Sequence, residues 1–319
     1  MKRTRVQKLL NNTALMALAL SILLFVIMVC FRPTAFNLNT IASILSFSSM
    51  LLFVCAGQMI VITSGDGIDL AAGAIMSTTA CITVEFMRGE NARLIPALLI
   101  CMVVGFGFGL FSGLGVAYLR IPALIMTMCM SNVLGKLQLV ISNGAPRGTV
   151  SDQLTAALTT RYLGFIPGIL LFAAVFYAIV VLFMKCTRFG HRLHLVGTNF
   201  EASRLSGIRA RRMRMFAYAI AGMLTGIGGL IGAGYYRQMQ VATFDNYTMQ
   251  SISAVVIGGT LLAGGSANYA GTITGTLLLI VLSQFLSAIN TSVAMRDIIM
   301  GGMLILLLIA YNRKPSVRQ

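Results

Sequence analysis

The sequence is poor in charge, above all in acidic residues. Asp, Glu, Lys and Arg make up 10% of the 319 residues, against about 25% in ordinary soluble domains. Hydrophobic residues account for 57%, and the mean hydropathy is +0.88. A soluble fold has too little interior to bury this much apolar surface, so the composition excludes that class of protein.

The sequence also lacks the motifs of nucleotide-binding and catalytic proteins. It contains no H-E-x-x-H and no G-x-x-x-x-G-K-[ST], because Gly135-Lys136-Leu137 lacks the Ser or Thr. No two of its six cysteines form a C-x-x-C, and we expect them to pack as small hydrophobic residues. We expect His191 and His194, in a basic loop, to be solvated. No catalytic residue, metal or cofactor is therefore expected on this chain.

Long apolar runs dominate what is present, and many are about 20 residues long, the length of a membrane-spanning helix. They predict an all-α fold: a polytopic transmembrane helical bundle of about ten spans, with residues 1–319 as a single domain. Two of the runs, 68–86 and 249–264, are Gly-marked or short and are candidates for interrupted or half-helices. The ten runs are 13–31, 44–63, 68–86, 94–118, 121–142, 163–185, 214–236, 249–264, 269–288 and 293–312.

Basic residues predict the topology, because they stay on the cytoplasmic side of a membrane. Fifteen of the 24 Lys and Arg lie near the N-terminus, between residues 185 and 214, or near the C-terminus. These three places are assigned to the cytoplasm, which an even number of spans on each side of the central stretch allows. The net charge of +16 thus points to membrane lipid rather than nucleic acid. The run 13–31 has no small-x-small cleavage site and is expected to be a span rather than a signal peptide.

The remaining loops, 32–40, 87–93, 142–162 and 237–247, then face outward. The longest, 142–162, contains "SNGAPRG", whose Gly and Pro oppose regular helix. It is either an idle connection or a docking surface for an outside partner. Glycines recur four residues apart at Gly105, Gly109 and Gly113, and at Gly222 and Gly226. This spacing lets helix backbones approach closely in lipid and predicts a crowded bundle.

Two carboxylates interrupt the apolar sequence in "SGDGIDLAAGA", residues 64–74. Asp66 and Asp69 stand among glycines that permit unwound backbone, which membranes tolerate only inside protein or beside water. Asp69 either caps the following helix or is a functional acid at membrane depth, such as an ion site. A similar x-L-x-A-G element recurs in "GGTLLAGGSAN", residues 258–268. The two elements suggest inverted repeat halves, about 41–142 and 214–312, bordering a substrate path.

A polar, basic stretch, "TRFGHRLHLVGTNFEASRLSGI", covers residues 187–208. Within it, Thr198 and Glu201 fit a capping box, and Gly207 is a good helix terminator. The expected helix of about eight residues is far too short to span a membrane. It is either a bare surface helix or a docking ridge in the largest cytoplasmic loop, residues 186–213.

These motifs resemble those of the membrane permeases of ribose-type sugar ABC importers, the branch that handles ribose, xylose, galactofuranose and autoinducer-2. "SGDGIDLAAGA" is similar to that family's GGIDLSVG, and "RIPALIMTM" to its R-I-P-x-F-I-x-T-L. The stretch at 187–208 resembles the family's T-x-F-G loop. "ISAVVIGGTLLAGGSANYAGTITG" resembles its A-V-V-I-G-G-T motif. The resemblance runs from about residue 40 to 312.

The resemblance implies a permease subunit that forms the path for a sugar or sugar-like solute. Its implied partners are a cytoplasmic ATPase that uses ATP and Mg²⁺, a second permease and an extracytoplasmic solute-binding protein, in the bacterial inner membrane. The implied coupling residues, gripped by the ATPase, are Asn199, Glu201, Ala202, Ser203, Arg204, Leu205 and Gly207. The elements implied to border the path contain Gly67, Asp69, Gly258, Gly259, Gly264 and Gly265, with Asp66 beside them.

Several positions depart from the family pattern. Ala71 and Ala72 replace Ser-Val, and Asp66 stands where Gly is common. These departures leave the substrate open and suggest a non-identical permease as partner, with a homodimer as the alternative. Spacing alone adds Ser131, Asn132, Gln138 and Ser142 as polar path residues. The alternative function is an ion-coupled secondary transporter in which Asp66 and Asp69 bind Na⁺ or H⁺.

Overall fold

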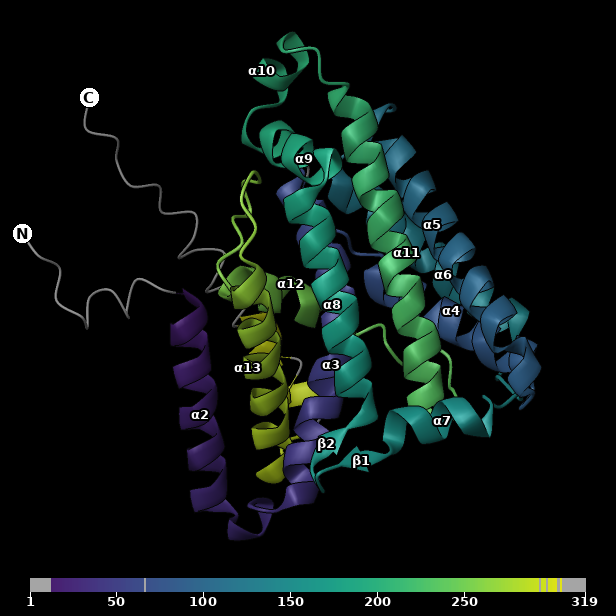
Figure 1. Cartoon of the computed structure of the whole chain (residues 1–319), viewed down its shortest axis with the longest axis vertical. Coiled ribbons are helices and arrows are strands. Elements are labelled where there is room, and N and C mark those ends of the chain that lie inside the picture. Colours follow the sequence, from purple (N-terminus) through teal and green to yellow (C-terminus); the bar gives the residue numbers. More distant parts are fainter. Residues whose placement is uncertain (1–12, 66, 293, 297, 303–304, 306–319) are drawn as a thin grey trace, which may run out of the picture.

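The computed structural model describes residues 13–65, 67–292, 294–296, 298–302 and 305. Over these residues the chain is almost entirely helical, as predicted. Its one strand pair joins β1 (Arg161–Tyr162) to β2 (Ile166–Pro167) in antiparallel register. The long helices run side by side as a bundle, with their connections gathered at its two ends (Figure 1).

Seven of the predicted runs form helices long and apolar enough to cross a membrane. Two others, 68–86 and 249–264, form the shorter helices α4 (Ala72–Met87) and α12 (Tyr247–Ile257). The tenth run, 293–312, lies largely outside the described residues. The seven long helices are α2 (Thr13–Phe31), α3 (Leu38–Thr63), α5 (Leu94–Ala117), α6 (Ala123–Ile141), α8 (Gly168–Cys186), α11 (Ala210–Tyr236) and α13 (Tyr269–Ala288).

The short helices mark the two ends of the bundle. At one end, α9 (Arg188–Thr198) and α10 (Phe200–Leu205) connect α8 to α11. At the other, α7 (Asp152–Thr159) and the strand pair lie across the bundle. We call these the α10 end and the α7 end. The short 3₁₀ helices η1 (Pro33–Ala35) and η2 (Asn91–Arg93) follow α2 and precede α5.

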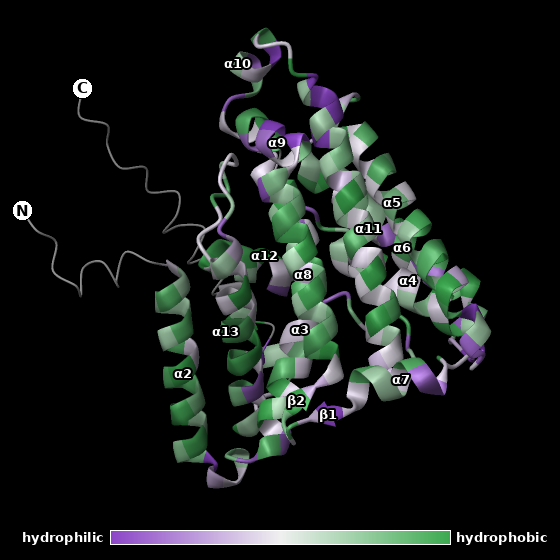
Figure 2. Ribbon diagram, in the orientation of Figure 1, coloured by the Kyte–Doolittle hydropathy of each residue, from purple (hydrophilic) through white to green (hydrophobic). Residues whose placement is uncertain are grey.

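Burial divides the long helices into central and peripheral ones. Helices α3 and α11 are the most enclosed: 83% and 72% of their most apolar windows are buried. The corresponding figure for α2, α5 and α6 is 22%. The peripheral helices are apolar on their exposed faces as well (Figure 2). A helix that is apolar on its exposed side is suited to lipid, which supports the membrane assignment.

Small residues allow close contact between α5 and α11. A Cβ added to Gly105 would lie 2.3 Å from the carbonyl oxygen of Gly222, and one added to Gly109 would lie 2.3 Å from that of Tyr218. A Cβ on Gly226 would meet the carbonyl oxygen of Cys101 at 2.4 Å. The prediction that the four-residue glycine spacing marks helix contacts is thus confirmed here.

Candidate functional site

The first interrupted segment joins α3 to α4. Its backbone turns through Gly65 and Gly67, whose φ angles of 76° and 108° are strained for residues with a Cβ. Asp69 is 2% exposed, and its Oδ1 accepts a hydrogen bond of 2.8 Å from the backbone N–H of Ala71. The carboxylate therefore orders the backbone just before α4 begins at Ala72. Asp66 lies outside the described residues.

Three helices hold this segment in place. The backbone N–H of Leu70 donates to Thr127 Oγ1 on α6, at 3.0 Å. The N–H of Gly73 donates to Thr248 Oγ1 on α12, at 2.9 Å. The buried Gln58 amide of α3 faces the Asp69 backbone; oriented to satisfy both groups, it donates to the Asp69 carbonyl and accepts from its N–H. The segment is thus a fixed part of the packed bundle.

The second interrupted segment, residues 258–268, joins α12 to α13. The backbone N–H of Gly265 donates to the carbonyl of Thr63 at 3.0 Å, so this segment meets the end of α3. A Cβ on Gly264 would lie 2.4 Å from the Cα of Gly65. The structure therefore brings Gly264 and Gly265 to the first interrupted segment.

Gly258 and Gly259 lie elsewhere in the second segment. A Cβ on Gly258 would meet the backbone of Gly271 on α13 at 2.4 Å, and one on Gly259 would meet Thr13 Oγ1 of α2 at 2.3 Å. Thr13 Oγ1 donates to the Gly258 carbonyl at 3.0 Å. These two glycines pack the chain's own helices together, away from Gly67 and Asp69.

The four polar residues expected on α6 divide into two pairs. Asn132 is exposed, with Nδ2 donating to Met128 of its own helix, and Ser131 is half-buried. Gln138 is fully buried; its Nε2 donates to the Ala74 carbonyl at 3.4 Å and its Oε1 accepts from the Ala242 N–H at 2.8 Å. Ser142 is also buried and donates to the Gln138 carbonyl. Gln138 and Ser142 therefore join parts of this chain and present no free group to a path.

The segment between α8 and α11 contains two helices rather than one. The predicted capping box is wrong: Thr198 ends α9, and its hydroxyl donates to the His194 carbonyl at 2.9 Å. The N-cap of α10 is Asn199, whose Oδ1 accepts from the Ala202 N–H at 2.9 Å. Glu201 forms an exposed ion pair with Arg204 at 2.8 Å, instead of bonding the backbone N–H of Thr198 as the capping box required. With six residues, α10 is also shorter than the eight predicted.

The other expected coupling residues are on α10 or directly after it. Leu205 is 82% exposed, a large value for an apolar side chain at the tip of a helix, whereas Ser203 is buried. Gly207 has a φ of 79° and turns the chain toward α11. The guanidinium of Arg214 lies 4.2 Å from the centre of the Phe200 ring, which fixes α10 against α11. Thus α10 projects from the bundle and presents an apolar tip (Figure 1).

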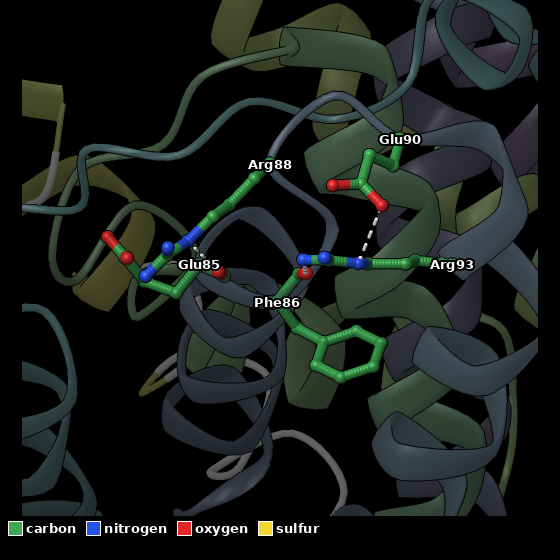
Figure 3. Close-up of polar contacts among 5 residues, drawn as sticks. All are labelled: Glu85, Phe86, Arg88, Glu90 and Arg93. Atoms are coloured by element: carbon green, nitrogen blue, oxygen red, sulfur yellow. Dashed lines mark hydrogen bonds and ion pairs between the residues drawn. The ribbon is translucent and has the colours of Figure 1, made fainter.

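A different arrangement closes the α7 end. In the turn between α4 and α5, Arg93 pairs with Glu90 at 2.9 Å and donates to the Phe86 carbonyl at 3.0 Å (Figure 3). Glu85 Oε1, on the same turn of α4, accepts from the backbone N–H of Arg147 at 2.7 Å. This contact between Glu85 and Arg147 fixes the loop that follows α6. Beside it lies an open cavity of about 840 Å³, lined by residues 144–148, by Tyr236 and by residues 238–241 and 243.

Sequence analysis missed several residues that fix these segments. Ser77 of α4 donates to Asp245 Oδ1 at 2.7 Å and accepts from the Phe244 N–H at 3.0 Å, which draws the segment before α12 into the bundle. His194 is half-buried and hydrogen-bonded, so the prediction that it is solvated is wrong. Polar residues in apolar helices signal such contacts, but the sequence does not show their partners. Among the described residues, no cluster of three or more His, Cys, Asp or Glu could hold a metal ion.

Comparison with known proteins gives one family. The family described as "Branched-chain amino acid transport system / permease component" matches residues 40–308. The chain is 28% identical to the ribose import permease protein RbsC of Escherichia coli K12, over 96% of this chain and 95% of that protein. It is 30% identical to the fructose import permease protein FruF of Bifidobacterium longum, over 88% and 82%. It is 28% identical to the autoinducer 2 import system permease protein LsrC of Yersinia enterocolitica, over 95% and 83%. No solved structure matches.

Proposed function

The chain belongs to the permease component family of branched-chain amino acid transport systems, and from this premise we propose that it forms the path of a binding-protein-dependent ABC importer for a sugar or sugar-like solute. The printed names of its relatives support this solute class: they import ribose, fructose and autoinducer 2. The observation that carries the mechanism is α10, a short capped helix that projects from the bundle with an exposed apolar tip.

The α10 end faces the cytoplasm, and both termini lie there, in the inner membrane of a bacterium. The positive-inside rule supports this orientation. At the α7 end five described arginines, Arg88, Arg93, Arg147, Arg161 and Arg237, lie with the acids Glu85, Glu90 and Asp152, whereas at the α10 end nine described basic residues stand beside one described acid, Glu201. Those nine basic residues are Arg120, Lys185, Arg188, Arg192, Arg204, Arg209, Arg211, Arg212 and Arg214.

A separate ATPase subunit docks on α10 and supplies the energy by hydrolysing ATP with Mg²⁺. Leu205 is the apolar anchor of this contact, because a large exposed apolar side chain in a polar surround is typical of interface centres. The contact surface contains Asn199, Glu201, Ala202, Ser203, Arg204, Leu205 and Gly207, of which the buried Ser203 supports the helix from below. Cavities of about 490 and 480 Å³ flank α10 and offer room for the partner's side chains.

The solute path runs beside α6, between this chain and a second permease. Ser131 and Asn132 lie on or near the exposed face of α6, which also carries the exposed Lys136. A charged side chain facing lipid at this depth is costly, so the face requires water or a protein partner. The segment with Gly67 and Asp69 borders the path from the cytoplasmic side, since Leu70 is bonded to α6. Gly264 packs on Gly65 of that segment and Gly265 is bonded to the end of α3, whereas Gly258 and Gly259 contact α13 and α2.

A solute-binding protein docks at the α7 end and delivers solute above the 840 Å³ cavity. The loop after α6 forms part of its wall and is fixed by Glu85. The polar residues Arg147, Gln238, Gln240 and Thr243 line the same cavity and offer donors and acceptors to a hydroxylated solute. Docking here places the delivered solute at the outer end of α6.

The first test is co-purification of the complex from membranes. An ATPase and a second permease should accompany the wild-type chain. We expect Leu205→Asp to reduce the retained ATPase at least about tenfold, as loss of an interface anchor does. Glu201→Arg, which breaks the pair with Arg204, and Gly207→Pro, which cannot adopt the positive φ, should also weaken it.

Leu163→Asp is the matched control, because Leu163 is 84% exposed but lies at the α7 end. This variant should retain the ATPase. Equal loss of the ATPase in both variants would show that α10 is not the docking element. A wild-type chain that purifies alone and transports solute on an ion gradient would overturn the proposal of an ABC importer. Mass spectrometry of the complex identifies the second permease; one kind of permease chain would refute a non-identical partner.

A further inference from the structure

His194 connects α9 to the second interrupted segment and to α13. Its Nδ1 lies 3.1 Å from the carbonyl oxygen of Gly265, and its Nε2 lies 3.1 Å from the hydroxyl of Tyr269. A carbonyl can only accept, so Nδ1 carries the proton and donates to Gly265. In the neutral ring Nε2 then accepts from the Tyr269 hydroxyl. One side chain of α9 thus holds both the segment before α13 and the first residue of α13 itself.

The backbone of α9 touches the same region without intervening side chains. A Cβ on Gly197 would lie 1.9 Å from the carbonyl oxygen of Thr63 and 2.5 Å from the backbone nitrogen of Gly265. Gly65 also packs on Gly197, since a Cβ on Gly65 would lie 2.9 Å from its carbonyl oxygen. Close-packed backbone transmits displacement, because no flexible side chain lies between the parts to absorb it.

Two further contacts extend this connection. Asn199 is both the C-cap of α9 and the N-cap of α10, so a single residue separates the two helices. On the other side, the hydroxyl of Tyr177 on α8 donates to the Tyr269 carbonyl at 2.8 Å, and Lys185 Nζ lies 5.2 Å from the centre of the Tyr269 ring. Tyr269 is therefore held from α8 and from α9 at once.

We propose that His194 is a positioning residue that transmits displacement of α10 to the segment 258–268 and to α13. This rests on the proposed function, in which an ATPase moves α10. His194 is half-buried and both of its ring nitrogens bond within this chain, so its proposed role is to position other groups rather than to bind the ATPase or the solute. Its two hydrogen bonds make α9 and the start of α13 move together, and without them only the backbone contact at Gly197 couples α9 to the segment 258–268.

The test uses the complete transporter in proteoliposomes, with solute uptake and ATP hydrolysis measured together. His194→Leu removes both hydrogen bonds and keeps an apolar side chain of similar size. We expect solute moved per ATP to fall at least about fivefold, the effect of losing one net hydrogen bond. ATPase retention and the hydrolysis rate should stay near wild type. His194→Asn can still donate to Gly265 and should recover part of the ratio.

His191→Leu is the matched control, because His191 is exposed and, in the part of the chain that the structure describes, its ring bonds to Thr187 in the turn before it. This variant should keep the wild-type ratio. Tyr269→Phe removes one hydroxyl and offers a milder variant with a smaller loss if His194→Leu does not assemble. An unchanged ratio in intact His194→Leu and Tyr269→Phe complexes would overturn this role. So would a proportional fall of uptake and hydrolysis that His194→Asn does not relieve. Failure of the wild-type complex to bind an ATPase would instead overturn the proposed function.

Discussion

The role of the Asp69 carboxylate bears on the choice between an ATP-driven importer and an ion-coupled transporter. An acid at membrane depth is a candidate functional group, and Asp69 is almost completely buried. Its Oδ1, however, accepts from the Ala71 N–H, and the Gln58 amide bonds both the N–H and the carbonyl of Asp69 itself. Asp69 therefore has a sufficient structural role in shaping the start of α4. Among the residues that the structure describes, the surroundings of Asp69 do not favour an ion-coupled transporter.

This assignment predicts that the charge of Asp69 is dispensable. In Asp69→Asn the side-chain oxygen still accepts from Ala71, so we expect uptake within about twofold of wild type. Asp69→Ala leaves the N–H of Ala71 without its acceptor and should destabilise the chain by about 1 kcal/mol. ATP-driven uptake and thermal unfolding of the purified complex measure the two effects. If Asp69→Asn abolished uptake without changing the melting temperature, the carboxylate charge would be essential and the ion-site interpretation would return.

The residues that sequence analysis missed share a physical cause. His194 bonds to Gly265 and Tyr269, more than 70 residues away, and Gln138 bonds to Ala242 at a separation of 104 residues. A polar residue in an apolar or basic stretch shows that a partner is needed, because buried polar groups are paired. Which partner it finds depends on how the helices pack, and no local pattern encodes that.

At the scale of elements, the contact between α5 and α11 depends on glycines, because a residue without a side chain lets the two backbones approach closely. Gly105 lies against the backbone of Gly222, whereas Gly107, half a turn away, has open space within 4 Å of an added Cβ. The two glycines share a helix and differ in what they face, which makes them a matched pair.

We predict opposite effects for the same substitution at these two positions. Gly105→Ala places a methyl group 2.3 Å from the Gly222 carbonyl oxygen and should destabilise the bundle by about 1–3 kcal/mol. Gly107→Ala should be neutral or slightly stabilising, since Ala favours helix over Gly by about 1 kcal/mol. Thermal unfolding in detergent distinguishes them. Equal melting temperatures for both variants would mean that α5 and α11 are not in close contact.

The existence of most helices could be predicted from apolar runs, but their ends could not. Helix α3 begins at Leu38, six residues before the run at 44, because Asn37 caps it: the Asn37 side chain accepts a hydrogen bond of 2.7 Å from the Thr40 N–H. Likewise α11 begins at Ala210, before the run at 214. The apolar run misses the first turn of this helix because the residues there are basic. Helix α9 escaped notice since only three of its residues, Gly190, Leu193 and Val196, are buried among charged ones. Capping and amphipathic surface helices leave weaker patterns than membrane spans do.

At the scale of the whole molecule, one exposed face that is mostly apolar also carries polar side chains. Helix α6 is mostly exposed, and Asn132 and Lys136 lie one turn apart on its exposed side. By contrast, α8 carries apolar residues such as Val175, 62% exposed, at a similar position along its length. This difference is what we expect if α6 borders water or the proposed second permease and α8 borders acyl chains.

Cysteine accessibility tests this distinction in the assembled transporter. The exposed Cys30, Cys129 and Cys186 are first replaced by Ala, and then Asn132→Cys or Val175→Cys is introduced. A cysteine beside a watery path ionises and reacts with a charged maleimide, whereas a lipid-facing thiol does not. We therefore expect Asn132→Cys to be labelled at least about tenfold faster than Val175→Cys, and excess solute to slow the labelling. Equal slow labelling at both positions would place α6 against lipid or dry protein, and the path would have to lie elsewhere in the bundle.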